Sequence, residues 1–108
     1  MKHGDVLTVA FAGDYGKPRP AIVIQSDGLG ETDSVLICQI TTTQRDTPLY
    51  RLPVPATAET GLRAESDVMV DKIFAVRRDK CGPVIGRLPD GSRATLNRML
   101  AVMIGLAD

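Results

Sequence analysis

The sequence predicts a mainly β domain, a small and strongly curved antiparallel barrel with one C-terminal helix packed across it. Three observations predict this class. β-prone segments joined by short polar links follow one another as far as Asp90. A helical period appears only after that residue. Finally, 108 residues with 44% apolar content suit one compact domain over residues 1–108, with a modest core.

The first two strands are expected to form a hairpin. Asp5–Phe11 alternates between apolar and polar residues, and residues 12–16 supply turn chemistry. Ala21–Ile24 is an unbroken apolar run rich in β-branched residues, which is typical of a strand covered on both faces.

The middle of the chain predicts further strands. Ser34–Thr42 is long and apolar, and Leu49–Val54 is shorter and carries a proline that places it at an edge or end of the sheet. Pro55–Glu65 is expected to be a loop or a single helical turn. Ser66–Arg78 predicts one long strand, or two joined at a bulge, and Cys81–Gly86 predicts a turn with at most a short strand.

The C-terminal segment changes period from strand to helix. Asp90 or Ser92 is expected to cap the helix and Gly105 to end it. Its apolar positions recur at helical spacing and should cover the sheet: Leu96, Met99, Leu100, Met103 and Ile104.

Charge and cysteine content exclude several classes of protein. Thirteen basic residues balance thirteen acidic ones, so a histone-like mode of nucleic-acid binding is excluded. No segment predicts a signal peptide or membrane span, so a cytoplasmic protein is expected. Cys38 and Cys81 have neither metal-ligand spacing nor a disulfide pattern, and no cofactor is expected. Cys38 is interpreted as a small core residue.

Arg19 is the first candidate for function. Pro18 and Pro20 stiffen the backbone around it, and its guanidinium must point to the rim because it cannot follow the apolar run inside. A rim arginine is either an ion-pair partner, for instance of Asp14, or an anion clamp.

Four motifs follow one another along nearly the whole chain: Gly4-Asp5-Val6, Arg19–Ile24, Gln39-Ile40-Thr41 and Ser66–Ile73. In order and spacing they resemble the MazF/PemK toxin family. This resemblance implies an SH3-like barrel that forms a homodimer. It also implies the toxin of a toxin-antitoxin pair, a metal-independent ribonuclease that cuts single-stranded RNA at short specific sequences.

The resemblance also implies site residues. Arg19 and Thr41 match the arginine and threonine of the family, and Asp71 matches an acidic position that some relatives use in catalysis. Met69 stands where those relatives carry an arginine, so the Arg/Asp form of the mechanism stays open. The residues expected to bind RNA are Asp14, Tyr15, Lys17, Thr42, Gln44, Arg45, Arg77 and Arg78.

Cleavage of RNA through its own 2′-hydroxyl has definite chemical needs. It requires in-line geometry, charge neutralisation at the phosphate, a proton acceptor and a proton donor, and it yields a 2′,3′-cyclic phosphate and a 5′-hydroxyl. Arg19 and Thr41 suit the phosphate. The acceptor stays open between Asp14, Asp71 and a water that they hold.

The expected partners are single-stranded RNA and an antitoxin with an acidic, disordered C-terminal segment laid over Arg19. Two alternatives keep the same fold: a CcdB-like toxin that poisons gyrase, and an inactive interaction module. The absence of tryptophan counts against the first, since CcdB depends on one near its C-terminus.

Overall fold

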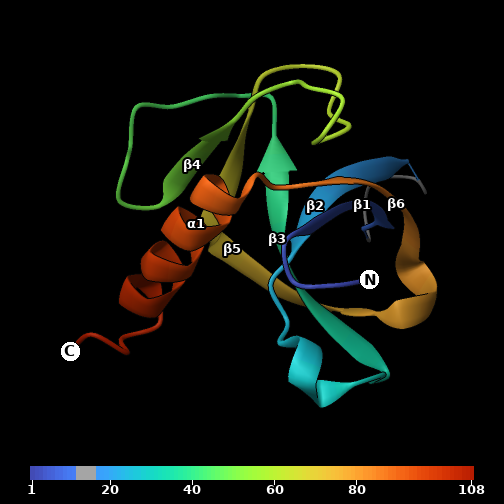
Figure 1. Ribbon diagram of the computed structural model, residues 1–108. Helices are drawn as coiled ribbons and strands as arrows, with labels where there is room; N and C mark the ends of the chain where they lie inside the picture. Colours follow the sequence, from blue (N-terminus) through green and yellow to red (C-terminus); the bar gives the residue numbers. More distant parts are fainter. Residues whose placement is uncertain (12–16) are drawn as a thin grey trace.

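The computed structural model describes residues 1–11 and 17–108. The described residues form six strands, two short 3-10 turns and one α-helix (Figure 1). The strands are β1 (Asp5–Ala10), β2 (Pro18–Val23), β3 (Ser34–Thr41), β4 (Arg51–Val54), β5 (Ser66–Arg77) and β6 (Cys81–Arg87), and the helix is α1 (Asp90–Met103).

All six strands belong to one antiparallel sheet in the order β4-β5-β3-β2-β1-β6. The sheet curls, and α1 lies across its β4 and β5 end (Figure 1). Among the described residues β4 and β6 do not pair, so the sheet remains open. The predicted class is confirmed as a curved, mainly β sheet with one C-terminal helix.

Each face of the curled sheet carries its own apolar core. The core under the helix gathers Val6, Ile22, Cys38 and Val68 around the fully buried Leu96. The core on the opposite face is built from the residues that alternate with these: Leu7, Val9, Ala21, Val23, Val35 and Ile37. The central strands are therefore buried on both faces, as the run Ala21–Ile24 predicts.

Residues Cys81–Arg87 correct one prediction. They form a complete strand, β6, paired to β1 with register shifts, where the sequence predicts a turn with at most a short strand. The segment between β4 and β5 lies against β6, and the Arg87 N–H donates to the Glu59 carbonyl at 2.9 Å. Gly61, at φ +71°, and Gly86 permit this contact, because a side chain at either position would meet backbone atoms. The loop that follows one edge strand, β4, is thereby hydrogen-bonded to the other edge strand, β6.

The helix differs from its prediction at both ends. It begins at Asp90, and neither Asp90 nor Ser92 caps it, since Pro89 occupies the cap position without a side-chain hydrogen bond. Gly105 follows the helix at φ +81°, as predicted. Ile104 is exposed and lies beyond the last helical residue, so it does not belong to the buried stripe.

Candidate active site

The site begins where β2 and β3 separate. The two strands pair at Val23 with Ile37, Ile22 with Cys38 and Ala21 with Gln39, and the pairing then stops. Pro20, the next residue of β2, has no N–H to donate to Ile40, so it cannot extend the ladder as other residues would. A hollow of about 300 Å³ opens at this point, lined by Arg19, Pro20, Gln39, Ile40, Thr41, Thr42 and Met69.

Continuation of the β2–β3 register past Ala21 and Gln39 would set Arg19 opposite Thr41. Directly opposed residues of an antiparallel pair project to the same face of the sheet. Arg19 is exposed and Thr41 half-buried, and both line the hollow. The structure thus brings together the two residues that the sequence marks most strongly.

The Thr41 hydroxyl has a defined orientation. Its Oγ1 accepts a hydrogen bond from the Thr43 N–H at 3.1 Å. A hydroxyl that accepts from a backbone N–H keeps its own proton for donation to another acceptor. Thr41 can therefore donate to an anionic oxygen placed beside Arg19.

A buried ion pair contacts the segment that follows Thr41, at residues 43–45. Asp67, 1% exposed, is 3.3 Å from Nη1 of Arg51, which is 8% exposed. Asp67 also accepts from the Arg45 N–H at 2.9 Å and from the Gln44 side chain at 3.3 Å. Sequence reasoning missed the role of both ionic residues, although two charges inside segments predicted to be strands were a usable signal.

Of the residues predicted to bind RNA, Thr42 lines the hollow and Lys17 lies close by. Arg45 is exposed and anchored through its backbone, whereas the Gln44 amide donates inward to Ser66 and Asp67. A second hollow of about 550 Å³ adjoins the first through shared residues, and its lining comprises Thr8, Lys17, Pro18, Pro20, Thr42, Gly61, Leu62, Arg63, Ala64, Ser66 and Ile85.

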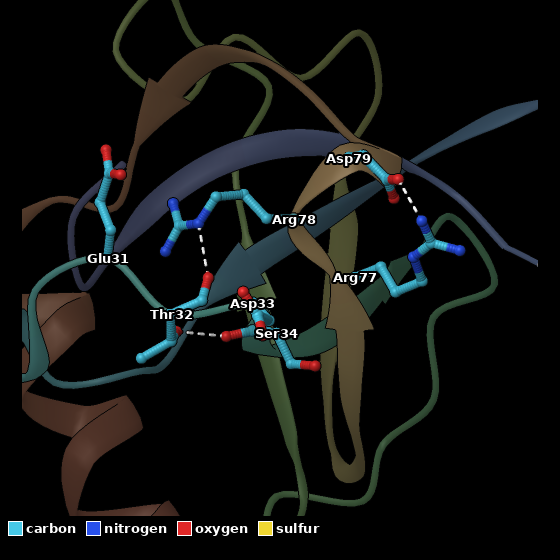
Figure 2. A pocket seen from close by; sticks show the side chains of 7 residues that line it. All are labelled: Glu31, Thr32, Asp33, Ser34, Arg77, Arg78 and Asp79. Carbon is cyan, nitrogen blue, oxygen red and sulfur yellow. Dashed lines mark hydrogen bonds and ion pairs between the residues drawn. The ribbon is translucent and has the colours of Figure 1, made fainter.

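Arg77 and Arg78 lie elsewhere. They line a separate hollow with Ser34 (Figure 2). Ser34 and Thr41 are the first and last residues of the eight-residue β3, so this hollow lies roughly 20 Å from Thr41 along the strand. Arg78 donates through Nε to the Thr32 carbonyl at 2.7 Å. Arg77 pairs with Asp79. The structure does not bring these two arginines to Arg19.

Asp71 does not line the hollow either. It is exposed on β5, within the stretch where the β3–β5 register shifts between Cys38 and Ile40. It is near enough to Cys38 to add to the effect of burial, which raises the pKa of that thiol to about 12. Cys38 is fully buried in the core under the helix, so its interpretation as a small core residue is confirmed. Asp14 and Tyr15 lie outside the described residues.

The described part of the chain contains no cluster of three or more histidine, cysteine or carboxylate side chains arranged to hold a metal ion. The ring of His3 lies between the Ile24 carbonyl, at 3.0 Å, and Asn97 Oδ1, at 2.7 Å, so it ties the N-terminal segment to α1. No helix among the described residues is long and apolar enough to cross a membrane.

Comparison with known proteins agrees with this arrangement. Residues 2–104 match the family model of the PemK-like, MazF-like toxin of type II toxin-antitoxin systems. The chain is 39% identical over 108 residues to a Mycolicibacterium smegmatis protein named "Probable endoribonuclease MazF", covering 99% of each chain.

Solved structures share the fold. A mycobacterial endoribonuclease in complex with its cognate antitoxin matches with a TM-score of 0.79 at 21% identity, over 98% of this chain and 96% of that one. The MazE–MazF complex of Deinococcus radiodurans matches with a TM-score of 0.79 at 21% identity, over 97% and 95%. The family match over nearly the whole length, on a fold with Arg19 and Thr41 at one hollow, shows that the chain belongs to the MazF/PemK toxins of type II toxin-antitoxin systems.

Proposed function

We propose that this chain is the toxin of a type II toxin-antitoxin system and acts as a sequence-specific, metal-independent endoribonuclease on single-stranded RNA. The observation that supports this most directly is the hollow between β2 and β3, where Arg19 and Thr41 line one space. Its volume of about 300 Å³ suits a phosphate group with part of the attached sugars.

Arg19 and Thr41 have distinct roles in the proposed reaction. The planar guanidinium of Arg19 binds two phosphate oxygens and neutralises the charge that gathers on them in the transition state. Thr41 donates a hydrogen bond from its hydroxyl to the same phosphate, since the hydroxyl oxygen already accepts one from the Thr43 N–H. The 2′-hydroxyl gives its proton to an acceptor and the 2′-oxygen attacks the adjacent phosphorus. The bond from phosphorus to the 5′-oxygen breaks, and that oxygen takes a proton from water, leaving a 2′,3′-cyclic phosphate and a 5′-hydroxyl end. Asp71, Asp14 or a water held by them stays the predicted proton acceptor.

The other residues predicted to bind RNA fit the surroundings of this hollow to different degrees. Lys17 and Thr42 line the adjoining hollow, whose apolar walls suit the face of an unpaired base. Arg45 projects from the loop beside Thr42 and suits a flanking phosphate.

The proposed partners follow from the same surface. An antitoxin with an acidic, disordered C-terminal segment would lie over Arg19 and fold as it binds, which blocks the phosphate site. Residues 1–108 act as one cytoplasmic toxin domain in a homodimer, and the limited core of so small a chain favours such a partner.

The test is cleavage of a mixed-sequence single-stranded RNA in EDTA, with the cut ends sequenced. We expect cuts at one short recurring sequence with cyclic phosphate ends, and no cut where the nucleotide 5′ of the break carries a 2′-deoxyribose. Arg19→Ala should lower kcat by about 10²- to 10³-fold, the loss typical of a removed transition-state donor. The matched control is Arg98→Ala, which removes an exposed arginine of α1 and should leave the rate unchanged.

If the folded dimer cuts no RNA, the proposed ribonuclease activity is wrong. Inhibition of gyrase by the same preparation would then favour the CcdB-like alternative. Antitoxin binding without either activity would favour an inactive interaction module.

A further inference from the structure

A chain of contacts leads from the buried interior to the hydroxyl of Thr41. The Asp67 carboxylate holds Arg51 through Nη1, at 3.3 Å, and the same Nη1 donates to the carbonyl of Thr43 at 2.9 Å. The N–H of Thr43 in turn donates to Thr41 Oγ1 at 3.1 Å. The Thr43 residue is thereby held on its carbonyl side by the ion pair, and it orients Thr41 through its N–H.

The remaining hydrogen bonds of Asp67 hold the same loop, at Gln44 and Arg45. Oδ2 accepts from the Arg45 N–H at 2.9 Å, and Oδ1 accepts from Gln44 Nε2 at 3.3 Å. Gln44 also donates to the Ser66 carbonyl at 3.3 Å. Among the described residues, the hydrogen bonds of the Asp67 side chain therefore go to Arg51 or to residues 44–45, which begin two positions after Thr42, the last residue of this loop that lines the hollow.

Burial makes this arrangement rigid. Asp67 and Arg51 are 1% and 8% exposed, so water does not screen the pair as it screens an exposed one. Burying two charges is costly, and a buried pair contributes little net stability compared with apolar residues of similar size. What the pair does is hold the Thr43 carbonyl and the Arg45 N–H in place.

We propose that Asp67 and Arg51 are positioning residues of the active site, which set the Thr41 hydroxyl against the scissile phosphate through the backbone C=O and N–H groups of Thr43. This inference rests on the proposed ribonuclease activity. Displacement of a reacting group by about 1 Å can lower a rate by on the order of 100-fold, so the pair matters to catalysis without touching RNA.

The experiment is a double-mutant cycle between Asp67→Asn and Thr41→Val, read by the kcat and KM of RNA cleavage. Asn has nearly the shape of Asp, but its amide N–H groups would face the N–H donors of Arg45, Gln44 or Arg51. We expect Asp67→Asn to lower kcat by about tenfold, with KM within about twofold of wild type. In the Thr41→Val background, which lacks the hydroxyl, the same change should lower kcat by less than about twofold.

The matched control is Asp46→Asn, which removes an exposed carboxylate from the same loop and should leave kcat unchanged. If circular dichroism shows that Asp67→Asn does not fold, the same cycle is run with Arg51→Lys. That change keeps the buried positive charge but replaces the planar fork with a point charge.

The outcomes separate the two proposals. An active wild type in which Asp67→Asn leaves kcat unchanged, or lowers it equally in both backgrounds, overturns the positioning role and leaves the ribonuclease intact. A wild type that cuts no RNA overturns both. If Asp67→Asn lowers kcat when Thr41 is present but not in the Thr41→Val background, the result supports the positioning of Thr41 by Asp67.

Discussion

The two ends of β3 use the same kinds of residue for opposite purposes. At the Thr41 end, an aspartate and an arginine are buried together and hold the backbone of a loop. At the Ser34 end, Arg77 and Asp79 pair with each other while 73% and 59% exposed. Arg78 binds the carbonyl of Thr32 nearby (Figure 2).

Solvent accounts for this difference. An exposed pair gains little, because water and salt screen it and two long side chains lose conformational entropy. A buried pair interacts strongly, and removal of one partner leaves an uncompensated charge in the interior. Of these two ion pairs, the one at the Thr41 end is therefore the one that can hold backbone atoms firmly in place.

The largest expected effect is the loss of the buried carboxylate. Asp67→Ala should lower the free energy of unfolding by about 3–5 kcal/mol, because the Arg51 guanidinium is left buried and unpaired. Urea unfolding followed by circular dichroism measures this quantity. The matched change at the other end, Asp79→Ala, should cost no more than about 1 kcal/mol. Equal losses at both ends would remove the distinction between them.

A second prediction concerns Cys38, which lies on β3 between the two ends. Burial, reinforced by Asp71, raises the pKa of the folded thiol above its usual value of 9.0 to about 12. Above pH 9 the unfolded chain loses this proton while the folded chain keeps it, so stability falls as pH rises. The expected slope is about 1.4 kcal/mol per pH unit between pH 9 and 12.

The measurement compares urea unfolding of the wild type and Cys38→Ala at pH 8.5 and 10.5. Tyrosine and lysine titrate equally in both proteins, so the difference between them isolates the thiol. We expect the wild type to lose roughly 2 kcal/mol more than the variant over this interval. Parallel losses would mean that the thiol ionises in the folded protein near its usual pKa.

Most of the fold was predictable because its strands are buried on one or both faces, which leaves a visible apolar pattern. The strand β6 was not, since Gly82, Pro83 and Gly86 are residues typical of turns. In the structure Gly82 lies close to the side chain of Thr8 and Gly86 close to the backbone of Thr60, which leaves no room for larger residues. The prolines and the family motifs singled out Arg19 and Thr41, which line one hollow in the structure, but they did not single out Asp67. The β4–β5 register pairs Asp67 with Pro53 and Arg51 with Met69, which sets Arg51 and Asp67 diagonally across from each other. Two charges inside predicted strands indicated that each needs a partner, but no local pattern says that the partner of one is the other.

The smallest expected effect is on the salt dependence of RNA binding. Its measurement shows whether RNA reaches the Ser34 end of β3. The sequence predicts that Arg77 and Arg78 bind RNA, whereas in the structure Arg78 is engaged with Thr32 and lies far from the hollow. Each phosphate contact on a single strand contributes about 0.7 to the slope of log affinity against log salt. We expect Arg45→Ala, at the Thr41 end, to lower that slope by about 0.7 and Arg78→Ala to leave it unchanged. Binding of a non-cleavable 2′-deoxy-substituted RNA, followed by fluorescence anisotropy from 50 to 200 mM salt, measures both. A fall of about 0.7 with Arg78→Ala would extend the RNA path along the whole of β3, and the two ends would then differ in rigidity but not in the ligand they bind.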